Sequence, residues 1–378
     1  MTIEVLLVLL VGAFLAYANG ANDVSKGIAT LVGCGVTGYR RAIAWGTAWT
    51  AIGGFLGALF ASAMLATFGS VLMAPGTTPT FAAALAAVLG AAGWVFFATR
   101  TGLPVSTTHA IVGSLTGVAA LAYGTDAVRW SALGGKVLLP LLVSPFASFL
   151  LTGVVLRVTQ GRSEASAERA DCLCAEVESA VVFAEGSGCA RSAALAPGSL
   201  QIRITMGPAE ACAASPAELR LTVDHLHWLT SGTTSLARGM NDAPKIVALL
   251  LAASALTGKE GISTATLFAL VTAVMVVGSV SAGRRITRVL AEKVTPMDHR
   301  EGFAANLVTA GLVTTGAIYG LPMSTTHVSS GAIFSAGVKR GSLNRKTLRD
   351  IVLAWVVTLP AAAALGMAAY LVARTIEG

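Results

Sequence analysis

Two Asn-Asp pairs lie inside apolar stretches of this chain, where polar side chains are costly. They are Asn22-Asp23 and Asn241-Asp242, and each pair follows a glycine by two positions. A carboxylate in hydrocarbon costs about 3 kcal/mol or more unless it has a partner, so it is a candidate functional group. Carboxylate and amide oxygens are hard ligands that suit Na⁺, and a carboxylate can also carry a proton. A helix break is predicted at each pair, because Gly20 and Gly239 precede the pairs and Pro244 follows the second one. The pairs are therefore predicted cation sites. The alternative is that each Asp only holds helices together through a nearby lysine.

Two hydroxyl triplets form a second pattern, and each comes shortly after a proline. They are Ser106, Thr107 and Thr108, and Ser324, Thr325 and Thr326. A proline favours the start of a helix, so the hydroxyls are predicted at the N-cap and in the first turn. The free N–H groups and the positive end of the dipole at such a helix start attract anions. Two such ends aimed at one point could hold a tetrahedral oxyanion, whereas one copy alone would be explained by ordinary capping.

Five further side chains could assist either site. Lys26, Lys245 and Arg238 could bind an anion or neutralise the two Asp carboxylates. His109 and His327 directly follow the hydroxyl triplets and could shuttle protons or bond to the anion. A packed, neutral histidine that only holds the chain in place explains these positions equally well.

Both motifs occur twice in the same order, which indicates a duplication. The segment that begins at Ala18 recurs at Ala237, and the segment that begins at Leu103 recurs at Leu321. The offsets are 219 and 218 residues, obtained as 237 − 18 and 321 − 103. Two separate motifs at nearly one offset are hard to obtain by chance. The chain is therefore predicted to hold two copies of one unit.

The basic residues predict that the two copies have opposite orientations. Arg40 and Arg41 follow the first motif of the first copy, whereas the second copy has the neutral pair Lys259 and Glu260 there. At the next loop the basic cluster, in residues 284–300, belongs to the second copy. Short basic loops face the cytoplasm. Equivalent loops are therefore predicted on opposite sides of the bilayer, as in an inverted-topology repeat with broken helices.

The composition predicts an all-α polytopic membrane protein. The chain has 378 residues, of which 54% are hydrophobic and 12% charged, whereas soluble domains carry about 25% charged residues. About 20 apolar residues span a bilayer as a helix. Apolar runs of this kind occupy residues 6–18, 42–68, 81–98, 132–156, 262–282 and 351–372. With five crossings per half, or more if interrupted helices count as halves, 10–12 transmembrane segments are expected. The net charge of +7 gathers at the ends of these runs, which argues against nucleic-acid binding.

One central stretch is polar and separates the halves. The expected organisation is a first membrane repeat over residues 1–158, a cytoplasmic loop or mini-domain over 159–221, and a second repeat over 222–378. Short strands are expected at 181–184 and 200–206. Cys172, Cys174, Cys189 and Cys212 lie in this stretch, and cytoplasmic thiols stay reduced, so free thiols are predicted rather than a metal site.

The paired Gly-x-Asn-Asp and Pro-x-Ser-Thr-Thr-His motifs resemble the signatures of the PiT family of inorganic phosphate transporters. The resemblance covers residues 4–158 and 222–374. It implies an inner-membrane secondary symporter that moves phosphate with Na⁺ or H⁺ and forms a homodimer. It places the cation ligands at Asn22, Asp23, Asn241 and Asp242, and the anion ligands at the two hydroxyl triplets. Some relatives are thought to move sulfate, so sulfate is the alternative anion.

Two other classes of function are weaker alternatives. The Ser-Thr-Thr-His strings contain the residue types of a Ser/His hydrolase, but triad partners are usually distant in sequence. No Gly-x-Ser-x-Gly elbow is present either. A membrane receptor that signals through the central stretch is the other alternative. A transporter without an enzymatic cofactor is therefore expected, with the lipid bilayer and a small oxyanion as its partners.

Overall fold

The computed structural model describes residues 3–68, 72–160, 172–183, 193–207, 219–256 and 262–377. These residues form two compact units. The helical unit combines Met1–Leu156 with His227–Gly378, so both predicted repeats pack into one body. The central unit is Arg157–Leu226.

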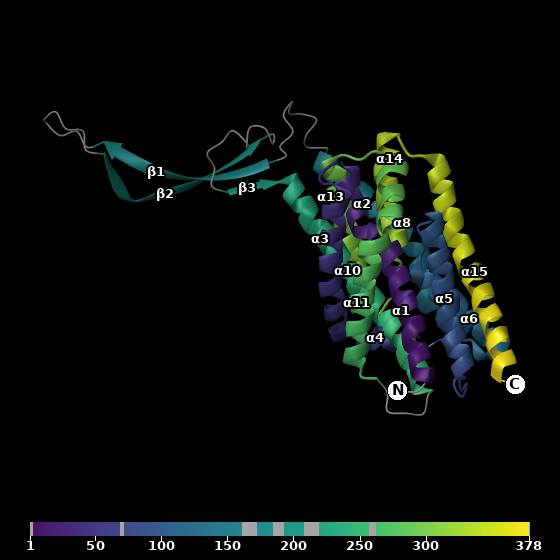
Figure 1. The fold of residues 1–378 in the computed structure, drawn as a ribbon. Helices are drawn as coiled ribbons and strands as arrows, with labels where there is room; N and C mark the ends of the chain where they lie inside the picture. The colour runs from purple at the N-terminus through teal and green to yellow at the C-terminus, as the bar shows by residue number, and fades with distance from the viewer. Residues whose placement is uncertain are drawn as a thin grey trace. The chain divides into compact units, whose positions relative to one another are not determined.

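Helices make up the helical unit, and both chain termini lie at the same end of it (Figure 1). The first half contains α1 (Ile3–Asp23), α2 (Ser25–Gly33), α3 (Tyr39–Gly57), η1 (Ala58–Phe60), α4 (Ala61–Ala66), α5 (Phe81–Thr101), α6 (Thr107–Tyr123), η3 (Thr125–Ala127), α7 (Trp130–Ala132), η4 (Leu133–Leu138) and α8 (Leu139–Gln160). The second half contains α10 (Val223–Ala255), α11 (Thr264–Ala282), α12 (Arg284–Arg288), η5 (Val289–Lys293), α13 (His299–Ile318), α14 (Thr325–Arg340) and α15 (Arg345–Glu377).

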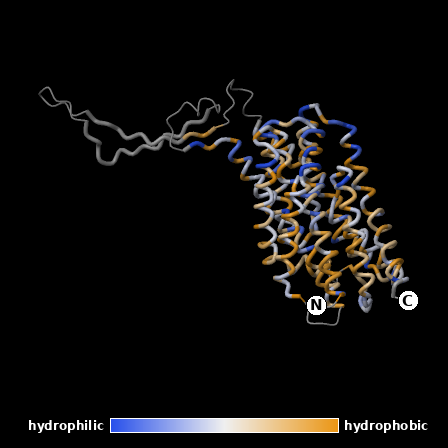
Figure 2. Tube along the Cα trace, viewed as in Figure 1, coloured by the Kyte–Doolittle hydropathy of each residue, from blue (hydrophilic) through white to orange (hydrophobic). Residues whose placement is uncertain are grey.

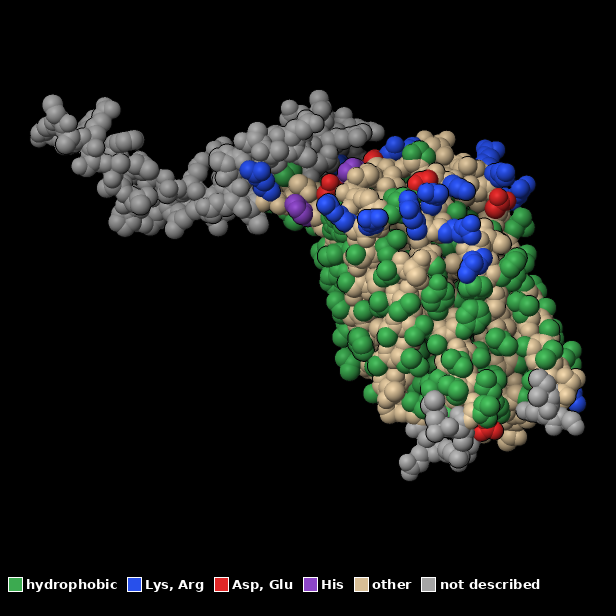
Figure 3. All heavy atoms as spheres, in the orientation of Figure 1, with side chains coloured by type: hydrophobic (Ala, Val, Ile, Leu, Met, Phe, Trp, Pro, Cys, Tyr) green, Lys and Arg blue, Asp and Glu red, His purple; other side chains and the backbone are tan. Residues whose placement is uncertain are grey.

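The surface of this unit is that of a membrane protein. In the described part of the chain, six helical segments are long and apolar enough to cross a bilayer. Hydrophobic residues predominate along the helices, except at the end away from the termini, where hydrophilic residues gather (Figure 2). Large apolar side chains such as Phe146 and Val356 are about two-thirds exposed, which is favourable only against lipid. Lys and Arg side chains gather at the end of the unit away from the termini (Figure 3). The predicted all-α polytopic class is confirmed.

The helix breaks differ between the two Asn-Asp pairs. In the first half α1 ends at Asp23 and α2 begins at Ser25, as the sequence predicts. In the second half α10 continues through the pair and through Pro244, so the prediction of a break there is wrong. A proline removes only its own N–H donor, and a helix can continue past it with a bend where neighbours support the freed carbonyl.

The larger interruptions are the connections α5–α6 and α13–α14, which are buried where they lead into α6 and α14. Val105 and Ser106 are at most 1% exposed in the first connection. Irregular backbone at membrane depth must find hydrogen-bond partners inside the protein. Side chains of the other half supply one to each loop: Thr326 Oγ1 donates to Val105 O, and Thr108 Oγ1 donates to Met323 O. These loops are held in place from the opposite repeat.

Glycines set the closest helix crossings of the unit. A β-carbon at Gly20 would overlap the Met275 carbonyl, where α1 crosses α11. A β-carbon at Gly239, the equivalent residue of the second half, would overlap the Thr50 carbonyl, where α10 crosses α3. Small residues at crossings let helix backbones approach closely in membranes. The two glycines thus position the Asn-Asp pairs that follow them.

The variant Gly239→Val is expected to separate α10 from α3. Overpacking of a tight contact costs about 1–3 kcal/mol, and here the obstacle is backbone, which cannot rotate away. We expect a lower temperature of aggregation for the detergent-purified protein, measured by fluorescence-detected size exclusion after heating. Gly311→Ala is the matched control, because a β-carbon there has no neighbour within 4 Å. Equal thermal stability of the two variants would contradict the crossing.

The central unit contains a three-stranded antiparallel sheet with strand order β2-β1-β3. Its strands are β1 (Cys172–Phe183), β2 (Ala193–Gly207) and β3 (Leu219–Thr222). The two strands expected from the sequence fall on β1 and β2, although residue 184 lies outside the described residues. Cys172 and Cys174 are each disulfide-bonded, although not to each other, since their sulfur atoms lie 3.7 Å apart. The prediction of free thiols is therefore wrong for both. Cys189 and Cys212 lie outside the described residues.

Candidate functional site

The two Asp carboxylates meet in the interior of the helical unit. Asn19 Nδ2 lies 3.0 Å from Asp23 Oδ2 and 3.2 Å from Asp242 Oδ2, so one amide nitrogen bridges carboxylates from both halves. The three side chains are at most 3% exposed. Two carboxylates this close repel each other unless positive charge stands beside them.

Three buried cations supply that positive charge. Lys26 Nζ lies 3.0 Å from Asp23 Oδ1, and Lys245 Nζ lies 3.3 Å from Asp242 Oδ1. Arg238 Nε lies 3.8 Å from Asp242 Oδ2. With all five groups ionised, three positive charges face two negative ones, and the cluster carries a net charge of +1. A buried site with surplus positive charge favours an anion. We call these five side chains with Asn19 the charged cluster.

Arg238 is the centre of the charged cluster rather than an accessory to it. Its two terminal nitrogens donate to Thr50 Oγ1 at 3.1 Å and to Asn19 Oδ1 at 3.2 Å. Its Nε has no hydrogen-bond partner within the part of the chain that the structure describes. Asn19 and Arg238 are also 219 residues apart, so they are equivalent positions of the two repeats in direct contact. Such self-contacts arise where two related units meet.

The Asn side chains of the two pairs tie the cluster to the buried loops. Asn22 Nδ2 donates to Thr99 Oγ1 at 3.0 Å and to Leu103 O at 3.1 Å. Asn241 Nδ2 donates to Met323 O at 2.9 Å. The loops that precede α6 and α14 therefore rest on the same residues that flank the carboxylates.

The hydroxyl triplets divide into caps and contacts. Ser106 and Ser324 are N-caps: their Oγ atoms accept from the N–H groups of His109 and His327. This confirms the predicted helix starts, and it commits both serine hydroxyls to capping. Thr325 is buried as well.

Two threonines reach the charged cluster directly. Thr107 Oγ1 donates to Asp23 Oδ2 at 3.1 Å, and Thr108 Oγ1 accepts from Lys245 Nζ at 2.8 Å. Thr326 instead donates to the opposite loop. The N-terminus of α6 is thus the one whose hydroxyls enter the cluster in this conformation.

Contacts between the halves are reciprocal. Thr108 Oγ1 donates to Met323 O at 3.3 Å, and Thr326 Oγ1 donates to Val105 O at 2.7 Å. Thr108 and Thr326 are equivalent residues, and so are Val105 and Met323. Each hydrogen bond from one half to the other therefore has an equivalent bond in the reverse direction, as at a two-fold interface.

The two histidines lie together but outside the charged cluster. The rings of His109 and His327 are 4.5 Å apart, and His327 also stacks on Trp355 at 4.1 Å. Both line an apolar cavity together with leucines of α8, including Leu141 and Leu142. This surrounding favours packed histidines over anion ligands.

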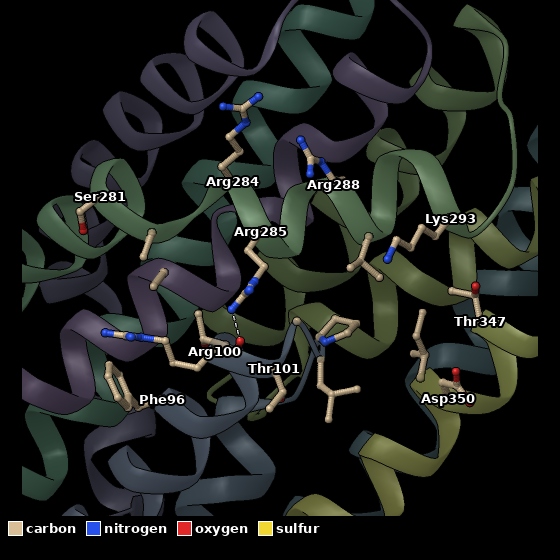
Figure 4. A pocket seen from close by; sticks show the side chains of 18 of the residues that line it. Phe96, Arg100, Thr101, Ser281, Arg284, Arg285, Arg288, Lys293, Thr347 and Asp350 are labelled. Carbon is tan, nitrogen blue, oxygen red and sulfur yellow. Dashed lines mark hydrogen bonds between the residues drawn. The ribbon is translucent and has the colours of Figure 1, made fainter.

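A basic cavity of about 850 Å³ adjoins the charged cluster. Figure 4 shows its cationic lining, which comes from α5, α12 and η5: Arg100, Arg284, Arg285, Arg288 and Lys293. Arg285 donates to the carbonyl of Arg100 across it. We call this cavity the basic vestibule. Thr99 and Leu103 also line it, and both accept from Asn22 Nδ2. One side chain therefore links the vestibule wall to the charged cluster.

Sequence reasoning missed three residues of the site. Asn19 bridges the carboxylates, Thr50 binds Arg238, and Thr99 binds Asn22. Asn19 could have been found, because the repeat alignment sets it opposite Arg238. Thr50 and Thr99 gave no signal, since single threonines within apolar helices usually bond to their own backbone.

Comparisons with known proteins agree with this architecture. The model of the phosphate transporter family matches residues 19–366. A protein of Arabidopsis thaliana named inorganic phosphate transporter 2-1, chloroplastic, is 29% identical over 95% of this chain and 70% of its own length. A Rhizobium meliloti protein named probable low-affinity inorganic phosphate transporter is 27% identical over 96% of this chain and 94% of its own. A solved structure titled the sodium-dependent phosphate transporter has the same fold, with a TM-score of 0.78, 21% identity and coverage of 99% of this chain and 100% of the other.

Proposed function

Because this chain belongs to the phosphate transporter family, we propose that it carries inorganic phosphate across the inner membrane by cation symport and alternating access. The relatives are transporters and permeases, and the chain is not an enzyme. The charged cluster is the observation that carries the proposal. It combines surplus positive charge, which attracts the anion, with two carboxylates that can hold a coupling ion. That ion is either Na⁺ or H⁺.

The net charge of the charged cluster supports phosphate over sulfate. A cluster of +1 is neutralised by a monoanion, and phosphate near neutral pH can carry the protons that make it one. Sulfate has no proton to bring, and it would leave the cluster negative. Burial of an uncompensated charge costs several kcal/mol. Sulfate uptake is therefore expected to be poor.

Burial of the charged cluster supports alternating access. Its side chains are at most 3% exposed, so an anion reaches Arg238 only after neighbouring segments move. The bonds from Asn22 to Thr99 and Leu103 stand between the cluster and the basic vestibule. We infer that they open and close during the transport cycle, as a gate on the vestibule side.

The reciprocal bonds between the halves support the inverted repeat. The positions of the termini support it too, because both ends of the chain lie opposite the basic end of the helical unit (Figures 1 and 3). A first half that ends on the side opposite its start, followed by a second half that returns, gives two units of opposite direction. By the positive-inside rule, we expect the basic end and the vestibule to face the cytoplasm. Hydrogen bonds to Glu301 raise the pKa of Arg340 at this end, which keeps its charge fixed.

The vestibule is expected to concentrate phosphate. The double variant Arg288→Gln, Lys293→Gln should raise the KM for phosphate on the vestibule side about threefold at low salt, because fields from clustered charges raise local anion concentration. The effect should shrink at high salt as the charges are screened. Arg374→Gln is the control, since Arg374 lies near the C-terminus and stacks on Tyr370. A change in kcat without a change in KM would contradict a collecting role.

The Ser/His hydrolase alternative does not fit the geometry. Ser106 Oγ accepts from the backbone N–H of His109, and Ser324 Oγ does so from that of His327. A nucleophile needs its hydroxyl on the imidazole instead. Both serines are committed to capping.

Uptake into proteoliposomes tests the proposed function. The purified protein should accumulate labelled phosphate when a pH or Na⁺ gradient is imposed, and labelled sulfate should remain near the level of protein-free vesicles. No phosphate accumulation under either gradient would refute phosphate symport. Equal rates for the two anions would refute the charge argument.

A further inference from the structure

The ammonium group of Lys26 occupies a cage of oxygens rather than a simple ion pair. Its Nζ lies 2.7 Å from Asn22 Oδ1, 2.8 Å from Asn22 O and 3.0 Å from Asp23 Oδ1. The cage thus combines an amide oxygen, a backbone carbonyl and a carboxylate. These are the hard oxygen ligands that a small metal cation would use. Lys26 is 1% exposed, so water does not compete for them.

Lys245 occupies a cage of the same composition in the second half. Its Nζ lies 2.8 Å from Thr108 Oγ1, 2.9 Å from Met323 O and 3.3 Å from Asp242 Oδ1. Again a neutral side-chain oxygen, a backbone carbonyl and a carboxylate surround one ammonium nitrogen. Lys245 is also 1% exposed. Both predicted cation sites therefore already hold a positive charge that belongs to the chain.

We propose that Lys26 and Lys245 are built-in counter-ions that take the place of co-transported Na⁺, so that this chain moves phosphate without Na⁺. The inference rests on the proposed transport function and selects its coupling ion. Each lysine is three residues after its Asp on the same helical stretch, so the cation is tethered and has no entropy to lose on binding. A sodium ion would have to displace an ammonium of equal charge from oxygens already in place. The proton is then the coupling ion, and phosphate itself carries it.

Tethered cations also explain why the chain keeps two lysines in the membrane interior. A buried lysine is costly unless its charge is matched and its three donors find acceptors. Lys245 meets both conditions, because its Nζ donates to three oxygens. Lys26 donates to two oxygens of Asn22 and has the Asp23 carboxylate as its ion partner. A lysine that served only to bind phosphate would have to leave a donor free for it. Among the described residues, Arg238 Nε is a donor of the cluster that has an ion partner but no hydrogen bond, so it is available to an anion.

The test compares the protein with Lys26→Ala and Lys245→Ala in proteoliposomes, under an imposed pH gradient. Uptake by the unmodified protein should change less than about twofold when Na⁺ is replaced by N-methyl-D-glucamine. Without Na⁺, phosphate uptake by each variant should be at least about tenfold lower than that of the unmodified protein. With Na⁺, part of this uptake should return, because the vacated oxygens can then bind the ion. Lys136→Ala, at an exposed lysine, is the control and should behave like the unmodified protein.

A second readout does not depend on transport. Na⁺ should raise the unfolding temperature of the two cage variants in detergent and leave that of the unmodified protein unchanged. A strict Na⁺ requirement of the unmodified protein, or its stabilisation by Na⁺, would overturn the inference. Variants that show neither Na⁺-restored uptake nor Na⁺ stabilisation would overturn it as well. Failure of the transport proposal gives a different pattern, since uptake would then be absent under every gradient.

Discussion

Replacing Asp23 or Asp242 by Asn is expected to abolish coupled phosphate uptake while leaving the protein in the membrane. Asn has nearly the shape of Asp, so packing is retained, but each change leaves a buried lysine without its carboxylate. Breaking a buried ion pair in this way costs about 3–5 kcal/mol. We therefore expect phosphate uptake to fall at least about 100-fold. The change also raises the cluster charge from +1 to +2, so a monoanion no longer neutralises it.

The measurement is initial uptake of labelled phosphate into proteoliposomes, normalised to the amount of reconstituted protein. Asp126→Asn is the matched control, because Asp126 is exposed in η3 and lies outside the charged cluster. Both Asp variants should elute from size exclusion as the unmodified protein does. Full phosphate uptake by both Asp variants would show that neither carboxylate is needed for transport.

Replacing Arg238 by Gln should weaken phosphate binding more than it weakens the fold. The change removes the surplus charge of the cluster and the Nε–H group that is available to donate to the anion, and a hydrogen bond to a charged group is worth about 1.5–3 kcal/mol. We expect the KM for phosphate to rise about 30- to 100-fold. The KM of Arg238→Lys should lie between that of the unmodified protein and that of Arg238→Gln. Lysine keeps the positive charge but loses the forked geometry that reaches Thr50 and Asn19 together.

Kinetics in proteoliposomes distinguish this role from a structural one. The exposed Arg349→Gln serves as the control for loss of one arginine. An unchanged KM in Arg238→Gln, with a fall in kcat alone, would assign Arg238 to helix packing and leave the anion to other residues.

The sequence was sufficient to predict the class of fold and to single out the two Asn-Asp pairs, whose carboxylates the structure brings together. A carboxylate inside a membrane is so costly that its position alone makes it a candidate functional group. The repeat offset showed that Asp23 and Asp242 occupy equivalent positions of the two halves. The hydroxyl triplets were predictable as helix starts because proline and capping act locally.

The rest of the site depends on packing between distant segments. The sequence indicated Arg238 only as an assisting residue, because its role comes from contacts with Asn19 and Thr50 on other helices. The lysines could be foreseen as partners of the Asp residues, but the cage of Lys245 requires Met323 and Thr108 from segments far along the chain. The unbroken α10 was also unforeseeable, since whether a helix continues past Pro244 depends on its neighbours.

The central claim is that phosphate binds among the charged side chains where the two halves meet. A crystal structure with arsenate, a tetrahedral analogue that scatters anomalously, tests this most directly. The account predicts an anomalous peak within hydrogen-bond distance of Arg238, between Asp23 and Asp242. A peak elsewhere in the helical unit, with normal phosphate uptake by the Arg238→Gln variant, would contradict it.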